Sequence, residues 1–408
     1  MAADEMVVGL DIGTSKVTAV IAEPQANGLP EIIGLGTAPS SGLRRGVVIN
    51  IEATLRSVVD AIEAAEQMAG REVKRVISGI AGSHVSGLNS SGVVAVTSRG
   101  REITEADVAR VIENARAVSI PMDREILHVI PRNFVIDEQG GIKNPLDMIG
   151  VRLEVEVHMI TGSVTAAQNL IKCVNRAGFE IQQVVFNSIA ASEAVLSRDE
   201  QELGVVLVDI GGGTTNVMVY QDGAPYHSFV LPVGGSQVTG DLSIMLKTST
   251  ESAEKIKRDD GCAYMALVED GEPVLVPGVG GRPPMQCTRS QICEIVQPRM
   301  TEIFSLVRER LDRQRMLDRV AGGLVLTGGG ALLPGVVELG QDIFDLGGRI
   351  GLPGRYGGLV DKYQSPQYAT AVGLVLHAMR EGVATGGSSK ERRGAGLKGL
   401  KRWVKHFF

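Results

Sequence analysis

Val205–Asn216 reads VVLVDIGGGTTN, an apolar run that leads into three consecutive glycines. The run is too uniformly aliphatic to alternate, so it predicts a strand that is covered on both faces. Glycine has no Cβ, and the backbone N–H groups of such a turn therefore approach phosphate oxygens closely. The two threonines add hydroxyl donors, and the aspartate is positioned to hold a Mg²⁺ shell or a water molecule. We assign this predicted phosphate-binding hairpin to Asp209, Gly211, Gly212, Gly213, Thr214 and Thr215.

Two further glycine-rich strand ends accompany this hairpin. Val7–Ser15 (VVGLDIGTS) again combines an apolar strand, an aspartate, a glycine turn and hydroxyls, and Gly322–Pro334 (GGLVLTGGGALLP) enters a second glycine triplet. Glycine-rich strand ends are ordinary α/β turns when they occur singly. Three in this order favour one nucleotide held between two related α/β halves. The remaining candidate residues are Asp11, Gly13, Thr14 and Ser15 in the first stretch and Gly328, Gly329 and Gly330 in the last.

This pattern resembles the actin, Hsp70 and sugar-kinase superfamily. The resemblance implies an α/β fold of two lobes that close on ATP and Mg²⁺. Asp11 and Asp209 would meet the metal through water, and the last triplet would lie along the adenosine. Asp241–Gly261 is predicted to be helical, with Glu254 and Lys257 on one face. This pair has two interpretations, an exposed ion pair or a contact to the ribose.

The length of 408 residues predicts two to four domains, and the hydrophobic content of 44% suits large buried cores. No run approaches the roughly 20 apolar residues that span a bilayer, and residues 1–6 are too acidic for a signal peptide. The four cysteines form no CxxC pair, which favours a reducing cytoplasm. The net charge of −6 hides a basic end, because residues 390–408 contain seven Lys/Arg and one Glu. The acidic body argues against nucleic acid as a partner.

Apolar spacing and capping signals predict several elements of the first half. Ile51–Ala69 has helical spacing, and Thr104–Asp107 is a capping box that opens another helix. Glu125–Asp137 reads as a strand that suits a sheet edge because it contains a proline. Val151–Met159 alternates apolar and polar residues, which predicts a strand with one wet face and His158 on that face.

The second half is predicted to place helices between its strands. Asn187–Leu196 is small and apolar and suits a helix that packs tightly where the halves meet. Tyr368–Met379 is predicted to be a small-residue helix that closes the second lobe. Thr288–Arg310 has helical spacing, and its internal proline predicts a kink or a split. Val279–Pro284 (VGGRPP) is too rigid for an element interior and predicts a shaped loop.

Three stretches make the resemblance more specific. Asn144–Gly162 (NPLDMIGVRLEVEVHMITG), Val279–Pro284 and Val205–Asn216 together resemble the FtsA family of bacterial cell-division proteins. The resemblance implies an actin relative that tethers FtsZ filaments to the cytoplasmic face of the inner membrane at the division site and helps assemble the septum. The implied partners are the FtsZ C-terminal peptide, with Arg299 as a counter-charge, further copies of the chain in filaments, other division proteins, and anionic lipids.

The resemblance also implies a division of the chain. The first lobe, 1A, takes residues 1–82 and 163–190, and a subdomain called 1C is inserted at 83–162, where it would meet other division proteins. The second lobe, 2A, takes residues 191–240 and 320–381. The remaining parts are an insertion called 2B at 241–319, which would bind FtsZ, a flexible linker at 382–395, and a membrane-targeting amphipathic helix at 396–408.

Two positions depart from the family pattern. Asp147 stands where the family usually has glycine, which affects a turn in the inserted subdomain. Asn187 stands where hydrolysing relatives have a Gln or Glu that orients the attacking water, so at most slow ATP hydrolysis is expected. Three alternatives are weighed against this reading: a metabolite kinase of the same superfamily, an Hsp70-like chaperone ATPase, and an adaptor of the pilus-assembly type.

The final twelve residues, Leu397–Phe408 (LKGLKRWVKHFF), separate into two faces on a helical wheel. A basic face opposite Leu, Trp and Phe predicts an interfacial helix that lies in the plane of a membrane. The alternative is a helix docked on another protein or on the body of the chain. The membrane-binding residues of this prediction are Leu397, Leu400, Lys401, Arg402, Trp403, Val404, Lys405, Phe407 and Phe408.

Overall fold

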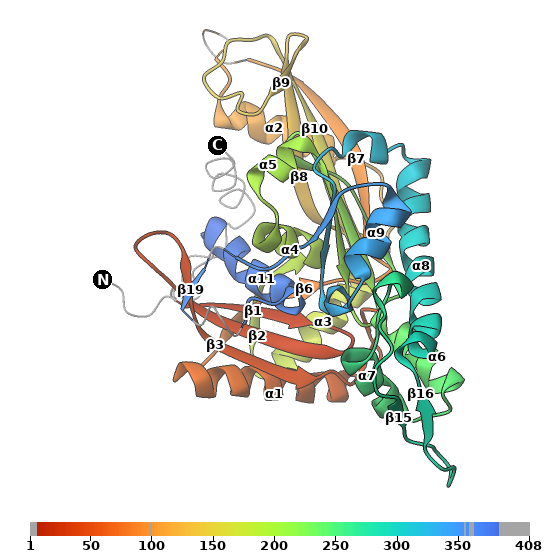
Figure 1. Ribbon diagram of the computed structural model, residues 1–408. Coiled ribbons are helices and arrows are strands. Elements are labelled where there is room, and N and C mark those ends of the chain that lie inside the picture. The colour runs from red at the N-terminus through yellow and green to blue at the C-terminus, as the bar shows by residue number, and fades with distance from the viewer. Residues whose placement is uncertain (1–5, 98–99, 101, 355, 359–362, 383–408) are drawn as a thin grey trace.

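The computed structural model describes residues 6–97, 100, 102–354, 356–358 and 363–382. Within these ranges, two β-sheets with flanking helices form two lobes, and a smaller insertion extends outward at the top of Figure 1. The predicted amphipathic helix at 396–408 lies outside the described residues, as does the predicted linker from residue 383 onward. None of the described helices combines the length and apolar character that crossing a bilayer requires.

The first lobe is built on a six-stranded sheet in which β1 carries the first glycine turn. β1 and β2 form an antiparallel hairpin, whereas β1, β6 and β11 run parallel. Side chains alternate along β1, so that Val8 and Leu10 pack towards α1 and α3 while the other face lies against α4 and α11. In sheet order the strands are β11 (Glu180–Phe186), β6 (Arg75–Ile80), β1 (Val7–Ile12), β2 (Lys16–Pro24), β3 (Pro30–Pro39) and β19 (Gly357–Gly358). The helices are α1 (Ile51–Ala69), α3 (Val164–Arg176), α4 (Asn187–Val195) and α11 (Ala369–Arg380).

Helix α1 confirms its predicted bounds. Asn50 caps its start, because the Asn50 Oδ1 accepts a hydrogen bond from the Ala53 N–H at 3.1 Å. Gly70 ends the helix with φ +64°, a left-handed conformation that glycine adopts without strain. The local sequence therefore fixes both ends of this helix.

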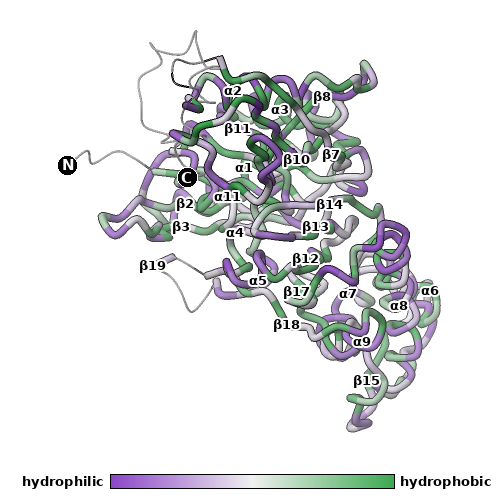
Figure 2. The backbone as a smooth tube through the Cα atoms, turned by 90° about the horizontal axis from the view of Figure 1, so that it is seen from above, coloured by the Kyte–Doolittle hydropathy of each residue, from purple (hydrophilic) through white to green (hydrophobic). Residues whose placement is uncertain are grey.

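The second lobe is built around β12, the strand of the glycine triplet. Its residues are buried on both faces as predicted: Val205 and Leu207 belong to the core shared with α4 and α11, and Val206 and Val208 to the core under α8. Figure 2 shows hydrophobic and hydrophilic residues mixed along α8, as expected of a helix with one buried face. The strands of this part are β18 (Gly348–Ile350), β17 (Leu324–Thr327), β12 (Val205–Ile210), β13 (Thr215–Gln221) and β14 (Ala224–Leu231). The helices are α5 (Arg198–Leu203), α6 (Gly235–Met245), α7 (Thr250–Asp259), α8 (Arg289–Arg313) and α9 (Val336–Phe344).

One helix prediction in this lobe is corrected, and of the two outcomes predicted for the proline in another helix the split does not occur. The stretch 241–261 is not one helix, because Lys247 has φ +51° and Ser249 caps a new helix by accepting from the Ser252 N–H at 3.1 Å. Helix α8, in contrast, continues through Pro298 without a split. Its buried face, which includes Val296 and Met300 on either side of the proline, holds the two halves on one core.

Short elements complete the lobes. The Val279–Pro284 segment forms the end of a two-stranded hairpin, and Gly280 and Gly281 have positive φ there, consistent with the predicted shaped loop. These short strands are β4 (Leu43–Arg44), β5 (Val47–Val48), β15 (Val274–Val276) and β16 (Met285–Cys287). The 3-10 helices are Met265–Leu267, Leu317–Arg319, Gly329–Leu332 and Pro366–Tyr368.

The insertion leaves the first lobe in the chain but joins the sheet of the second lobe in space. Ser86 of β7 pairs with Phe229 of β14, which creates one nine-stranded sheet in the order β18-β17-β12-β13-β14-β7-β10-β8-β9. Strand β8 is thus second from the edge. Its short neighbour β9 pairs only from Phe134 onward, which leaves Pro131 without a β9 partner. The elements are β7 (Ser86–Ala95), α2 (Glu105–Arg116), β8 (Arg124–Ile136), β9 (Gln139–Ile142) and β10 (Arg152–Ser163).

Side chains reinforce this junction between the insertion and β14. The Asn89 Nδ2 donates to the carbonyl oxygen of Tyr226 at 3.1 Å, and the guanidinium of Arg132 lies 3.8 Å from the centre of the Tyr226 ring. Further out, Lys143 forms an ion pair with Glu202 of α5. Each of these contacts joins the insertion to the second lobe.

His158 corrects the prediction of a wet face on β10. It is fully buried at the same junction, where Nδ1 lies 2.6 Å from the Asn89 Oδ1 and Nε2 lies 2.9 Å from the Ser228 Oγ. Because the amide oxygen only accepts, Nδ1 carries the proton and the serine hydroxyl donates to Nε2. Burial, assisted by the nearby His227 and Arg132, lowers the His158 pKa to about 3. The outer part of the strand, with Glu156 exposed, does follow the predicted alternation.

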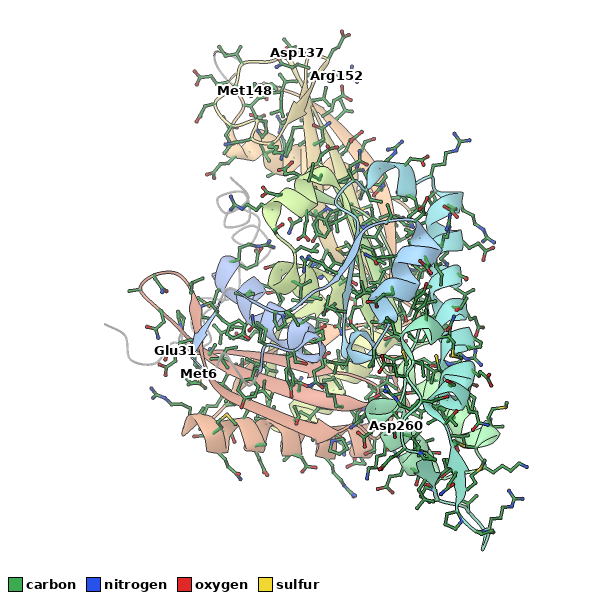
Figure 3. All side chains as sticks on the ribbon, viewed as in Figure 1. Met6, Glu31, Asp137, Met148, Arg152 and Asp260 are labelled. Atoms are coloured by element: carbon green, nitrogen blue, oxygen red, sulfur yellow. The ribbon has the colours of Figure 1, made fainter. Side chains whose placement is uncertain are left out.

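The outer end of the insertion contains the Asp147 departure from the family pattern. Asp147 has φ +62°, in the left-handed region that glycine adopts without steric cost and that Asp tolerates. Figure 3 shows Asp137, Met148 and Arg152 gathered at this end, and both Asp137 carboxylate oxygens accept from the Val151 N–H. A residue with a Cβ therefore occupies the turn without breaking it.

Helices α4 and α11 connect the two lobes. A Cβ on Gly373 would overlap the carbonyl of Ala190, so the two backbones touch where the helices cross. Asn187–Leu196 was predicted to pack tightly where the halves meet, and this contact confirms it. Tyr368–Met379 was predicted to close the second lobe, but α11 packs on β1, β2 and β6 of the first lobe. The crossing sets the distance between the two sheets.

We predict that His158→Ala lowers the free energy of unfolding by about 2–4 kcal/mol, because it removes a buried ring and leaves the Ser228 hydroxyl and the Asn89 amide oxygen without their partner. Urea denaturation of the full chain measures the difference. Glu156→Ala, an exposed position on the same strand, is the matched control and should change it by less than about 0.5 kcal/mol. Equal effects of the two substitutions would contradict a structural role for the buried imidazole.

Candidate nucleotide site

The first glycine turn closes on itself and on a neighbouring hairpin. The Gly13 N–H donates to the carbonyl of Lys16 at 3.0 Å, which makes the tight turn between β1 and β2. The Thr14 Oγ1 accepts from the Gly46 N–H at 3.2 Å, which ties the loop to the β4–β5 hairpin. Ser15 remains exposed at the tip.

The second glycine turn is held from behind by α6. The Gly235 N–H donates to the carbonyl of Gly211 at 2.9 Å, and the Ser236 N–H donates to that of Gly212 at 2.8 Å. In the part of the chain that the structure describes, the N–H groups of Gly212 and Gly213 are used by no hydrogen bond. A turn whose carbonyls are engaged and whose N–H groups are free suits an anion.

All three glycine motifs converge, as the sequence predicts. A Cβ on Gly212 would overlap the Ser15 side chain, and one on Gly213 would lie 2.9 Å from the Thr14 Oγ1, so the first two turns face each other. A Cβ on Gly328 would overlap the Asp209 carboxylate. Gly329 and Gly330 follow in a 3-10 helix, with Gly330 against Ile210.

Two carboxylates stand at the base of the facing turns. Asp11 accepts from the Asn187 Nδ2 at 3.2 Å, and Asp209, which is buried, accepts from the Asn216 Nδ2 at 3.0 Å. Burial and the charge of Asp209 raise the Asp11 pKa to about 7, and burial also raises the pKa of Asp209. Two neighbouring buried carboxylates whose pKa values are both raised suit a cation between or near them.

The residues therefore fit a Mg²⁺-nucleotide on two observations: the unused glycine N–H groups and the paired carboxylates. Among the described residues, no group of three or more His, Cys, Asp or Glu side chains is close enough to hold a metal ion by itself. As ligands of a nucleotide or a metal, the named residues stay predictions.

Asn187 is the first residue of α4 and lies beside Asp11. Its Oδ1 is buried and has no hydrogen-bond partner in the structure. The nitrogen of the Asn187 amide is thus held by Asp11, and its oxygen can still accept a hydrogen bond.

Glu254 and Lys257 adjoin the second turn. The Lys257 Nζ lies 2.6 Å from the Glu254 Oε2, 2.9 Å from the Thr239 Oγ1 and 3.2 Å from the carbonyl of Gly235. Burial alone would raise the Glu254 pKa, but hydrogen bonds from Lys257 and Thr239 lower it, while burial lowers the pKa of Lys257. The pair is therefore part of a half-buried hydrogen-bond network between α7 and α6 rather than a free surface ion pair, and contact with a ribose stays a prediction.

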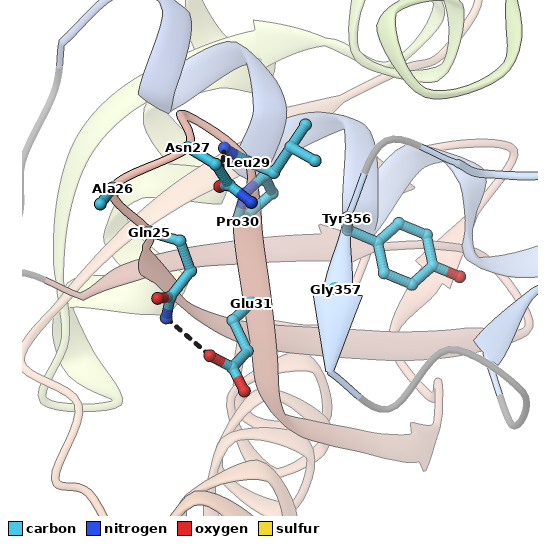
Figure 4. Close-up of a pocket in the computed structure, with 8 residues that line it drawn as sticks. All are labelled: Gln25, Ala26, Asn27, Leu29, Pro30, Glu31, Tyr356 and Gly357. Atoms are coloured by element: carbon cyan, nitrogen blue, oxygen red, sulfur yellow. Dashed lines mark hydrogen bonds between the residues drawn. The ribbon is translucent and has the colours of Figure 1, made fainter.

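The sequence reasoning missed two residues of this site. Lys16 follows directly after the first turn, and Asn216, the last residue of the opening stretch, holds Asp209. Adjacency to the turns was the available signal for both. A separate surface pocket of about 430 Å³ lies at the other end of β2, around Gln25, Glu31 and Tyr356, and takes no part in this arrangement (Figure 4).

Two lobes with sheets joined at crossing helices and glycine turns at their facing strand ends define the class of actin-like proteins. Among solved structures, the PilM–PilN type IV pilus biogenesis complex superposes with a TM-score of 0.65 at 17% identity, covering 91% of this chain and 98% of that one. MreB5 of Spiroplasma citri bound to ADP gives a TM-score of 0.55 at 15% identity, covering 91% and 95%. These likenesses confirm the predicted fold class.

Sequence comparison is more specific. The family model of cell division protein FtsA matches residues 206–373, and that of the SHS2 domain inserted in FtsA matches residues 82–161. The cell division protein FtsA of Pseudomonas aeruginosa is 45% identical over 99% of this chain and 98% of its own length, and that of Escherichia coli K12 is 40% identical over 99% and 98%. The chain belongs to the FtsA family of cell division proteins. The pilus-assembly alternative shares the fold without comparable identity.

We predict that Asp11→Asn stabilises the ligand-free protein above pH 7. A folded-state pKa of about 7, above the unfolded value of 3.8, means that the free energy of unfolding falls as the pH rises between these values. An amide does not ionise, so the Asp11→Asn variant should not lose this stability. The loss in the wild type is at most about 4 kcal/mol, because each unit of pKa shift corresponds to about 1.36 kcal/mol.

Urea denaturation at pH 5 and pH 8, without Mg²⁺ or nucleotide, measures the effect. The exposed Asp199→Asn serves as the control of equal charge change. If wild type and Asp11→Asn respond identically to pH, the proposed environment of Asp11 is wrong.

Proposed function

We propose that this chain is an ATP-binding, actin-like cell-division protein that tethers FtsZ filaments to the cytoplasmic face of the inner membrane at the division site and helps assemble the septum. Membership of the FtsA family supports the division role. The observation that carries nucleotide binding is the pair of carboxylates between facing glycine turns with unused N–H groups. The proposed parts are the lobes 1A and 2A, the insertions 1C at 83–162 and 2B at 241–319, and the linker and terminal helix described above.

In this proposal the two turns hold the phosphates of ATP through backbone N–H groups and hydroxyls. Asp11 and Asp209 orient the water shell of Mg²⁺, whose charge offsets that of the phosphates. Glu254 and Lys257 meet the ribose, and the last glycine triplet lies along the adenosine. The Lys257 ammonium already makes three hydrogen bonds, which hold it in place before a ligand binds.

Turnover should be slow. The Asn187 amide is one methylene shorter than Gln and is tied to Asp11, so it is poorly suited to orient a water for attack. ATP then acts mainly as a ligand that sets the lobe arrangement and assembly state. A metabolite kinase would need a catalytic base, and no sequence signal identifies one.

We predict that Mg-ATP at about 100 times its dissociation constant stabilises the folded chain by roughly 2.7 kcal/mol. Asp209→Ala should remove most of this shift because it takes away one of the two carboxylates. Thermal melts with and without Mg-ATP measure it, with the exposed Asp199→Ala as control. If Mg-ATP does not change the melting temperature of the wild-type protein, the assignment of the nucleotide site is wrong.

The FtsZ C-terminal peptide is proposed to bind 2B. The sequence suggested Arg299 as its counter-charge, but this guanidinium already meets Asp241 at 2.6 and 3.1 Å and also pairs with Glu302. An acidic peptide would therefore exchange with Asp241 or Glu302 rather than meet a free charge. Apolar contacts with neighbouring side chains, such as the exposed Ile244 and Met245 at the end of α6, would supply the remaining binding free energy.

Self-association into actin-like filaments, and contacts of 1C with other division proteins, are the remaining proposed interactions. The outer end of the insertion exposes Ile149 and Val151, at 70% and 46% of their full surface. Neighbouring apolar side chains of this kind suit a protein contact. This surface supports a role for 1C in binding.

Membrane attachment is assigned to the terminal segment on its sequence. Each Lys or Arg near an anionic leaflet contributes on the order of 1 kcal/mol, and the Leu, Trp and Phe face enters the interface. The remainder of the chain is acidic, so the same anionic surface attracts the basic end and repels the body. No nucleic acid is expected as a partner.

We predict that the protein recruits FtsZ filaments to anionic vesicles and that truncation after Arg393 abolishes this. Co-sedimentation with vesicles of anionic and of neutral lipid measures both steps. Trp403→Glu should release the protein from vesicles, whereas Lys401→Glu with Arg402→Glu should weaken binding and raise its salt sensitivity. If the truncated protein still sediments with anionic vesicles, the terminal segment is not the membrane attachment.

A further inference from the structure

Three arginine side chains lie against aromatic rings of β14 where the insertion meets the second lobe. The Arg132 guanidinium of β8 lies 3.8 Å from the centre of the Tyr226 ring, and that of Arg319 lies 5.6 Å from the same centre. The Arg319 Nη1 also donates to the Tyr226 hydroxyl at 3.4 Å. The Arg310 guanidinium of α8 lies 5.1 Å from the centre of the Phe229 ring. We call Arg132, Arg310 and Arg319 the arginine cluster.

The surface between the two aromatic rings is continuous along β14. Tyr226 is followed by His227, whose ring centre lies 5.5 Å from that of Phe229. Burial and the charge of Arg310 both lower the pKa of His227, so its imidazole is mainly neutral at pH 7. The positive charge of this surface therefore comes from the three guanidinium groups.

The charge of the arginine cluster is uncompensated within the part of the chain that the structure describes, where none of its members forms an ion pair. Glu309 and Asp312, the carboxylates next to Arg310 along α8, already pair with other arginines of that helix. The Arg132 Nε is buried and donates to no described acceptor. Like charges that lie together repel, and a buried donor without an acceptor costs free energy, so a bound anion would relieve both.

The spacing of the cluster favours several carboxylates on one peptide over a single small anion. Tyr226 and Phe229 are three residues apart on one strand, roughly 10 Å at about 3.3 Å per residue, so one phosphate cannot meet the arginines at both rings. An extended segment rich in Asp or Glu spans this distance, and guanidinium binds carboxylate through two parallel hydrogen bonds. Stacking on the rings holds the planar groups in place before binding, which reduces the entropy lost.

The charge of the whole chain points to the same kind of partner. Its net charge is −6, so three uncompensated cations on the body are a local exception that attracts an acidic segment. The cluster also lies apart from Arg299, which precedes Arg310 by roughly 16 Å along α8 and already meets Asp241 and Glu302.

We propose that the arginine cluster is a docking site for an acidic peptide segment of another protein, and that the bound segment fastens the insertion to the second lobe. Arg132 belongs to the insertion, whereas Arg310 and Arg319 belong to the second lobe. A segment that meets all three therefore bridges the junction at which β7 pairs with β14. Its carboxylates also remove the repulsion between the arginines.

The first test measures the affinity of the full chain for a fluorescently labelled hexaglutamate peptide, with hexaglutamine as the uncharged reference. The wild type should bind hexaglutamate at low ionic strength, and binding should weaken as salt is added. Arg310→Gln with Arg319→Gln, both at exposed positions, should weaken it about 10-fold, as expected for two partly exposed charge pairs. Arg176→Gln with Arg313→Gln is the matched control, because it removes the same charge from guanidinium groups that already pair with glutamates.

Hydrogen exchange then locates the bound peptide. In the wild type, hexaglutamate should slow amide exchange in residues 86–89 of β7 and 226–229 of β14, because the bound segment holds the insertion against the second lobe. This slowing should be lost in Arg132→Gln, which removes the arginine that the insertion contributes. Arg152→Gln, at another arginine of the insertion that already pairs with Glu154, should keep it.

The expected result is a loss of affinity in the double variant that its control does not share. Wild-type affinity in the double variant overturns the proposal, and so does an equal loss in the control, which would show attraction to bulk charge only. Loss of binding in Arg299→Gln with retention in the double variant would place the peptide at 2B and also overturn it. Melting temperatures show that each variant is folded, and if the double variant is not, the affinity of Arg319→Gln alone decides.

Discussion

The close crossing of α4 and α11 is the contact on which the rest of the molecule depends. Backbone touches backbone where Gly373 meets Ala190, and no larger residue fits there. Because α4 begins at Asn187 beside Asp11, and α11 begins next to Gln367, the same crossing sets the geometry of the site. The close crossing leaves no room between the two helices, and the strands that pack on them bring the two glycine turns face to face.

Local signals made most of this architecture predictable. The apolar run before Asp209 required burial on both faces, and the capping residue Asn50 together with Gly70 fixed a helix at both ends. The convergence of the three glycine motifs followed from their order and chemistry. Each of these features depends on residues that are neighbours in the chain, where sequence patterns are most informative.

The missed features depend on contacts between distant segments. Alternation along β10 suggested a wet face, but His158 reaches across Gly87 of the neighbouring β7 to the Ser228 Oγ of β14 and is buried there. No glycine or proline near Lys247 marks the break between α6 and α7 in the sequence. The hydrogen bond from Lys16 to Gln367 joins residues that are 351 positions apart in the chain.

The junction of the insertion with β14 makes the insertion a lever arm. Its two chain connections leave from the first lobe, while Asn89, Arg132 and Lys143 fasten it to the second. A rotation of one lobe against the other must therefore shear this seam or carry the whole arm with it. Displacement grows with distance from the pivot, so a small angular change at the helix crossing becomes a large excursion near Ile149, where the apolar surface is exposed.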